Sequence, residues 1–120
     1  MGDTNELTGL HYVGVLLAVV SGLIHLRLGV GFAPSPMGIS FLFAGVVFLA
    51  AGVGVLVDYH RERLYQLGIP FVAGQIVLWY YFNFATGDKS FPADVGTLGA
   101  VDKLAQVALV AVLALLLGNE

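Results

Sequence analysis

Four long runs of apolar residues, separated by short polar segments, dominate the chain. The runs cover about residues 10–32, 37–57, 66–84 and 100–118. An α-helix needs about 20 largely apolar residues to cross the hydrocarbon core of a bilayer, and each run is close to that length. The pattern therefore predicts four membrane-spanning helices.

The segments between the runs carry residues that end helices. Pro34 and Pro36 separate the first two runs, and a charged segment over 58–68 leads into the third. Proline ends one helix and can begin the next. The segment 86–99 is the longest connection, and we expect it to have functional structure of its own. Short connections make successive helices antiparallel neighbours. The sequence thus predicts an all-α fold, an integral membrane four-helix bundle of up-down topology, as one domain over residues 1–120.

Composition agrees with a membrane location. Of 120 residues, 58% are hydrophobic and 11% are charged, whereas a soluble domain carries about 25% charged residues. A chain this short cannot form a soluble core large enough to hide so much apolar surface. We therefore expect a multi-pass protein of the cell membrane, with the lipid bilayer around it.

Several function classes are excluded or lose support. The absence of cysteine excludes disulfides, thiolate metal sites and cysteine nucleophiles. The few basic residues form no nucleic-acid patch. Neither a zinc-protease HExxH motif nor a phosphate-binding glycine-rich motif occurs. The acidic N-terminus lacks the positive region of a signal peptide, so the first run is expected to be a retained helix. We expect no catalytic residue set and no metal site.

The basic residues give conflicting indications of the orientation of the chain in the membrane. Arg61 and Arg63 lie in a short loop, which places that loop and both termini in the cytoplasm. Lys89, Lys103 and Arg27 would then lie toward the outer side, against the positive-inside rule. Charge alone leaves the orientation open.

The first run carries a face of small residues and two histidines. Its members recur at three- and four-residue steps, which places them on one side of a helix. Small residues let a neighbouring backbone come close. We expect Gly14, Ala18 and Gly22 to be a helix-packing face in a homo-oligomer or a larger membrane complex, and the leading hypothesis is a non-enzymatic packing or accessory subunit. The face comprises His11, Gly14, Ala18, Ser21, Gly22, His25 and Gly29.

His25 supports a second hypothesis. Ionisable side chains at membrane depth usually face the bundle interior and often mark function. A buried neutral histidine could be an axial haem ligand, and ligation by two histidines would then need a dimer. The second hypothesis is therefore a haem- or cofactor-binding membrane redox protein. The alternative to ligand binding is that His25 makes one hydrogen bond that holds two helices together.

Polar residues of the later runs support a third hypothesis. Gln75 lies near the middle of the third run and needs a partner there. Asp102 and Gln106 share a face of the fourth. We expect a polar pocket formed by His25, Gln75, Asn83, Asp102 and Gln106, which would line the path of a channel or small-solute transporter. Separate helix-packing hydrogen bonds would explain the same residues.

Three further polar residues have two readings each. Arg27 lies about 200° around the helix from His25, so we expect it to extend to the headgroups rather than pair with Asp102. His11 and His60 lie at the same end of the predicted bundle. They are expected to be solvated histidines, and a His11–His60 pair is the alternative.

Two stretches suggest a family. SGLIHLRLG (21–29) and LGIPFVAGQIVLWYYFN (67–83), with the acidic N-terminus and few lysines, resemble uncharacterised small four-helix membrane proteins of halophilic archaea. The resemblance covers most of the chain and implies the same four-helix membrane fold. Such proteins have no assigned activity, so it implies no functional residue.

Overall fold

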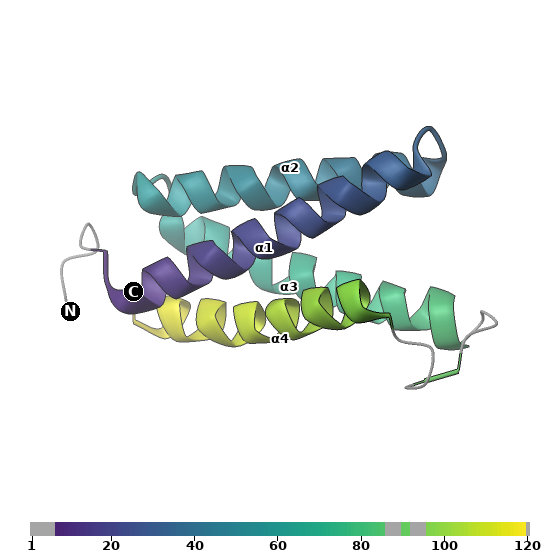
Figure 1. Cartoon of the computed structure of the whole chain (residues 1–120). Coiled ribbons are helices and arrows are strands. Elements are labelled where there is room, and N and C mark those ends of the chain that lie inside the picture. Colours follow the sequence, from purple (N-terminus) through teal and green to yellow (C-terminus); the bar gives the residue numbers. More distant parts are fainter. Residues whose placement is uncertain (1–6, 86–89, 92–95, 120) are drawn as a thin grey trace.

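The computed structural model describes residues 7–85, 90–91 and 96–119. Over these residues the chain is all-α, as predicted, and Figure 1 shows its four long helices. Each of them, with η1 counted as part of α3, is long and apolar enough to cross a membrane. The elements are α1 (Gly9–Phe32), α2 (Pro36–Leu56), α3 (Arg61–Tyr80), the π-helical turn η1 (Tyr81–Ala85) and α4 (Thr97–Gly118).

Successive helices run antiparallel, with α1 between α2 and α4 (Figure 1). A Cβ added at Gly45 of α2 would lie 2.9 Å from the carbonyl oxygen of Gly22 in α1, so the two backbones are in close contact. On the other side of the molecule α3 packs along α4. Helices α2 and α3 contact each other much less. The bundle is therefore closed on three sides and loosely packed on the fourth.

The described interior contains two apolar clusters. One joins Phe48, Val72 and Leu109 from three different helices. The other surrounds Tyr65, which is fully buried. Outward-facing positions are also apolar, and Leu104 is 72% exposed. A soluble bundle would place polar residues on that outer surface.

The helix ends follow local chemistry. Ser35 caps α2 by accepting a hydrogen bond from the Gly38 N–H, and Pro36 occupies the first helical position. Between α2 and α3, Asp58 and His60 adopt positive φ angles of 58° and 49°. Asp and His are among the non-glycine residues that adopt this conformation most readily.

Helix α3 begins at Arg61, earlier than the predicted span over 66–84. The charged segment was expected to be a connection, but Arg, Glu and Leu are good helix formers. The Arg61 side chain is buried and donates from Nε to the Val55 carbonyl at 2.7 Å, at the end of α2. The same carbonyl also accepts from the Asp58 N–H at 3.3 Å, so Arg61 adds a second hydrogen bond at the end of α2. Of the connection 86–99, residues 86–89 and 92–95 lie outside the described residues.

Candidate functional site

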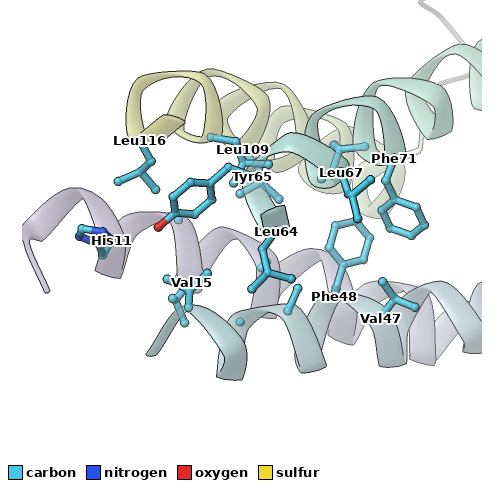
Figure 2. Close-up of a pocket in the computed structure, with 18 of the residues that line it drawn as sticks. His11, Val15, Val47, Phe48, Leu64, Tyr65, Leu67, Phe71, Leu109 and Leu116 are labelled. Atoms are coloured by element: carbon cyan, nitrogen blue, oxygen red, sulfur yellow. The ribbon is translucent and has the colours of Figure 1, made fainter. Parts of the chain in front are cut away.

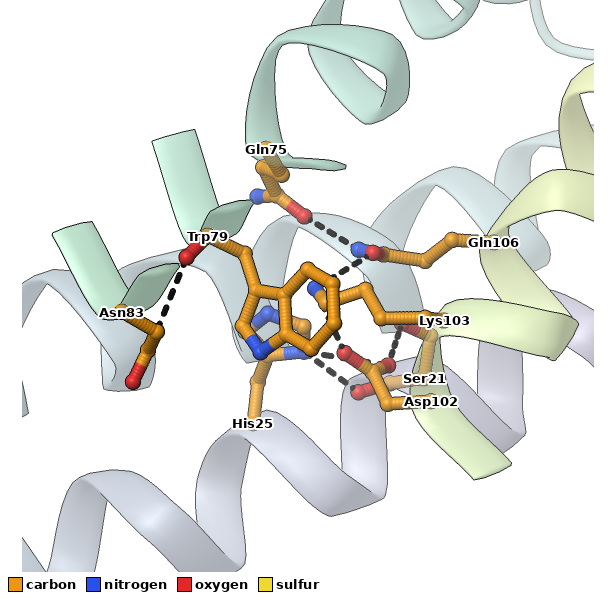
Figure 3. Close-up of polar contacts among 8 residues, drawn as sticks. All are labelled: Ser21, His25, Gln75, Trp79, Asn83, Asp102, Lys103 and Gln106. Carbon is orange, nitrogen blue, oxygen red and sulfur yellow. Dashed lines mark hydrogen bonds and ion pairs between the residues drawn. The ribbon is translucent and has the colours of Figure 1, made fainter. Parts of the chain in front are cut away.

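A group of hydrogen-bonded side chains lies between α1, α3 and α4, as Figure 3 shows, and we call it the polar cluster. It occupies the half of the bundle in which α1 leads into α2 and α4 begins. Most of its members are buried, although the surrounding helices are apolar. The polar cluster comprises Ser21, His25, Gln75, Asp102, Lys103 and Gln106.

Asp102 is the centre of the polar cluster. Its Oδ1 accepts a hydrogen bond of 2.5 Å from the Ser21 hydroxyl, which joins α4 to α1. Its Oδ2 lies 3.0 Å from the Lys103 Nζ. Asp102 is only 3% exposed, and a buried charge is tolerated when it is paired and hydrogen-bonded. Both oxygens of this carboxylate therefore have a polar partner.

Lys103 extends the polar cluster toward α3. Its Nζ donates to Gln106 Oε1 at 2.6 Å and lies 5.5 Å from the centre of the Trp79 ring. Gln106 Nε2 in turn donates to Gln75 Oε1 at 2.6 Å. A cation over an indole face is stabilised by the ring quadrupole. The amide at mid-helix in α3 thus has the partner that an apolar environment requires.

His25 lies at the edge of the polar cluster. Its Nδ1 is 2.8 Å from the backbone carbonyl oxygen of Ser21 and 3.8 Å from Asp102 Oδ1. A carbonyl oxygen only accepts, so Nδ1 carries a proton. The ring centroid is 5.7 Å from that of Phe41 and 5.4 Å from that of Phe48. Aromatic rings from α2 therefore pack against the imidazole.

The arrangement of Ser21, His25 and Asp102 differs from a nucleophilic triad. In a triad the serine hydroxyl donates to the histidine, which is oriented by the carboxylate. Here the hydroxyl donates to Asp102 directly, and the imidazole binds a backbone carbonyl. The geometry leaves the histidine unable to take the serine proton without rearrangement. The Ser21–Asp102 pair is therefore a buried, charge-assisted hydrogen bond between α1 and α4.

The structure brings together four of the five residues expected in a polar pocket: His25, Gln75, Asp102 and Gln106. The fifth, Asn83, donates to the Trp79 carbonyl at 2.9 Å within its own helical segment. Ser21 and Lys103 belong to the polar cluster but were not among the expected pocket residues. Ser21 lies four residues before His25 and Lys103 lies three residues before Gln106, so helical spacing gave a signal for both.

The remaining polar residues have separate surroundings. Arg27 is exposed on the outside of α1, while Asp102 pairs with Lys103, so the alternative Arg27–Asp102 pair is not the arrangement found. His11 is buried and accepts from the Thr8 N–H at 3.0 Å through Nδ1. His60 is exposed beside the Tyr59 ring.

The small-residue face of α1 is used within the chain. An added Cβ at Gly14 would meet Val112 of α4 at 3.2 Å. One at Gly22 would lie 3.2 Å from the Gly45 carbonyl oxygen of α2. Ala18, between them, belongs to the buried core. The face lets α2 and α4 approach α1, so an oligomer of this chain would have to use other surfaces.

An apolar cleft opens between α2 and α3, and Figure 2 shows its lining. It has a volume of about 590 Å³ and lies in the half of the bundle opposite the polar cluster. Residues of α1 and α4 form its floor. Among the described residues that line it, His11 and Tyr65 carry the only polar side-chain atoms. His25 does not line it.

Comparisons with known protein families, curated proteins and solved structures give no match to this chain. Among the described residues, no group of three histidines, cysteines or carboxylates could hold a metal ion. The polar cluster and the cleft are therefore interpreted from their own chemistry.

Proposed function

We propose that this chain is a small multi-pass integral membrane protein of the cell membrane, with its four long helices as spans and an up-down topology. The support is the distribution of polarity: many exposed helix positions carry large apolar side chains, and the polar side chains in the middle of α1 and α4 are paired within the polar cluster. In a bilayer an unpaired polar group costs several kcal/mol, whereas an exposed leucine costs nothing. The arrangement suits a lipid surrounding.

Within the membrane, the role that the geometry supports best is a non-enzymatic packing or accessory subunit. The observation that carries this proposal is that the members of the polar cluster satisfy each other. Asp102 is paired by Ser21 and Lys103, and Gln106 by Lys103 and Gln75. Such a network fixes helix positions and presents no activated nucleophile or base. The lipid bilayer surrounds the chain, and a second copy or a larger membrane complex would bind to the outer faces of its helices.

A channel or small-solute transporter is a second candidate, supported by the continuity of the polar cluster. Its hydrogen bonds run from Lys103, whose side chain is 14% exposed, to Ser21 and Gln75 in the middle of their helices. The interior beyond them is the apolar cleft. A complete path would therefore require a further polar segment from a rearrangement or a partner.

The haem alternative has one supporting observation. A histidine whose Nδ1 donates to a backbone carbonyl is in the tautomer that metal-ligating histidines use. However, the His25 ring packs on Phe41 and Phe48, and the cleft is lined by other residues. Haem ligation at His25 would require α2 to move away.

Membrane insertion is tested by carbonate extraction and by single-cysteine labelling, for which the cysteine-free chain is a ready background. Tyr59, between α2 and α3, and Thr97, the first residue of α4, lie at opposite ends of the helices. We expect cysteines at these two positions to react with an impermeant maleimide from opposite sides of sealed vesicles, while a cysteine at exposed, mid-helix Val46 stays unreacted. Release of the protein by carbonate, or equal labelling at all three positions, would contradict the proposal.

The accessory role is tested by crosslinking in native membranes. Cysteines at Phe43 of α2 and Leu104 of α4 lie on two outer faces. We expect a photoactivatable crosslinker at one of them to give a discrete product, either a dimer of this chain or an adduct with one partner. Lipid adducts alone at both positions would contradict it. Proton flux into liposomes that is lost in Asp102→Asn would favour the transporter, and a Soret band lost in His25→Ala would favour the haem protein.

A further inference from the structure

Two side chains that are able to carry a positive charge lie beside the Asp102 carboxylate. Lys103 Nζ is 3.0 Å from Oδ2, and His25 Nδ1 is 3.8 Å from Oδ1. Figure 3 shows both side chains directed toward the carboxylate. Only Lys103 is in close contact, because His25 Nδ1 donates to the Ser21 carbonyl at 2.8 Å instead. In this arrangement Lys103 is the counter-ion of Asp102, and His25 is near enough to take its place.

The second ring nitrogen of His25 has room for a proton. Within the described part of the chain, the imidazole makes its polar contacts through Nδ1 alone, and Nε2 has no hydrogen-bond partner. The side of the ring that faces α2 packs against Phe41 and Phe48. Imidazole is the side chain that gains or loses a proton in the physiological range. A proton taken up by His25 would therefore be held at Nε2.

The surroundings of Asp102 favour one cation at a time. Among the described residues, His25 and Lys103 are the only ionisable side chains paired with it. Helix α3 contributes the Gln75 amide and the Trp79 ring to this region, and the residues of α2 that face His25 are aromatic. Arg27, on α1, is exposed on the outside of the helix. A second buried cation would have no anion of its own, which an apolar interior disfavours.

We propose that His25 is a proton-binding site and that the imidazolium formed there displaces Lys103 from Asp102. A proton from water binds Nε2, and no covalent bond within the chain is broken. The positive ring then attracts the carboxylate, and the Lys103 ammonium moves out toward the end of the bundle. The interior keeps one positive and one negative charge in both states, because one cation replaces the other. The proposal goes beyond the packing role, since it makes the packing of the helices depend on pH.

Lys103 is well placed for this movement. It lies about 9 Å from the start of α4 at Thr97, at 1.5 Å per residue. Its side chain is 14% exposed, and a lysine stem can lie along an apolar surface while the ammonium reaches the headgroups. Its departure breaks the contacts with Gln106 Oε1 at 2.6 Å and with the Trp79 ring at 5.5 Å. Because Trp79 belongs to α3, proton binding at His25 removes a contact between α3 and α4.

Trp79 is the only tryptophan, so its emission reports the position of Lys103. For the full chain in detergent, we expect the emission to change with a single midpoint in the range where histidines titrate, about pH 5–8. In His25→Gln this change should be lost, because glutamine takes up no proton. The control is His60→Asn, which replaces an exposed histidine by a residue that tolerates its positive φ angle of 49°. It should keep the wild-type response.

Lys103→Gln separates proton binding from displacement. Nuclear magnetic resonance of isotope-labelled histidine should show that the His25 ring still titrates in this variant, whereas the Trp79 emission no longer follows it. Wild-type emission that stays constant over this pH range would overturn the proposal, and so would a response that persists in His25→Gln or in Lys103→Gln. If His25→Gln loses helical content, the comparison of wild type with Lys103→Gln decides alone. The measurement needs no partner, so its result is independent of the crosslinking that tests the accessory role.

Discussion

In the half of the molecule where α1 leads into α2, the interior is polar and α1, α3 and α4 converge. Asp102 and Ser21, which are 81 residues apart in the chain, are joined there by a hydrogen bond of 2.5 Å. In the half that holds the start of α1 and the end of α4, the interior is mainly apolar, although His11 and Arg61 are buried near its helix ends. Here α2 and α3 leave a cleft of about 590 Å³ between them.

The physical reason for the difference is the cost of leaving a group without a partner. A polar side chain in an apolar surrounding requires a hydrogen bond, and therefore holds its neighbours at a fixed distance. An apolar side chain gains nearly the same from lipid as from another helix. Polar interiors in a membrane bundle therefore specify helix positions, and apolar interiors leave room for other molecules. Free energies of unfolding in detergent test this contrast.

The largest loss of unfolding free energy is expected from Asp102→Leu. It leaves the Lys103 ammonium and the Ser21 hydroxyl without their carboxylate partner. Breaking a buried ion pair on one side costs about 3–5 kcal/mol. We expect a loss of about that size, with an altered emission of Trp79, the only tryptophan, because Lys103 lies over its ring. The double variant Asp102→Leu/Lys103→Met should recover part of the loss. A single variant as stable as the wild type would contradict the role of the polar cluster.

The second largest loss of unfolding free energy is expected at the close contact between α1 and α2. In Gly45→Ala the new Cβ would lie 2.7 Å from the Leu26 Cγ and 2.9 Å from the Gly22 carbonyl oxygen. Overpacking of this kind costs about 1–3 kcal/mol. Gly74→Ala is the control, since nothing lies within 4 Å of the added atom, and alanine favours a helix by up to about 1 kcal/mol. The midpoint temperature of thermal unfolding should fall in Gly45→Ala and rise in Gly74→Ala.

A smaller effect is expected from Ser21→Ala, which removes one hydrogen bond to Asp102 and leaves the ion pair with Lys103. Hydrogen bonds between membrane helices contribute about 1 kcal/mol. Ser40→Ala is the matched control, because that hydroxyl is exposed and bonds within its own helix to the Met37 carbonyl. Chemical unfolding curves should separate the two variants by about 1 kcal/mol; coincident curves would show that the link between α1 and α4 contributes nothing.

The smallest effect is expected in the apolar half. An added Cβ at Gly52, which lines the cleft, meets only Val15 Cγ1, at 3.7 Å, an ordinary contact. Gly52→Ala should therefore change the unfolding free energy by less than about 1 kcal/mol, in the stabilising direction that helix propensity gives. A destabilisation as large as that of Gly45→Ala would show that the cleft is closed in the folded protein.

Much of the helical structure and part of the polar cluster could be predicted from sequence. Uninterrupted apolar runs and the proline pair predicted helices close to α1, α2 and α4, because both signals are local. The start of α3 was missed because a charged segment is typical of a connection. Its early start depends on Arg61 reaching the Val55 carbonyl of the preceding helix, which is a tertiary contact.

The sequence by itself determined which residues are apolar, which share a helical face, and that Gln75, Asp102 and Gln106 need partners. Only the tertiary structure decided the partners: Asp102 pairs with Ser21 and Lys103 rather than Arg27, and Asn83 bonds to its own helix. It also decided that the cleft opens between α2 and α3. The reason is that periodicity is fixed within one helix, whereas pairing depends on the rotation and depth of helices far apart in the chain.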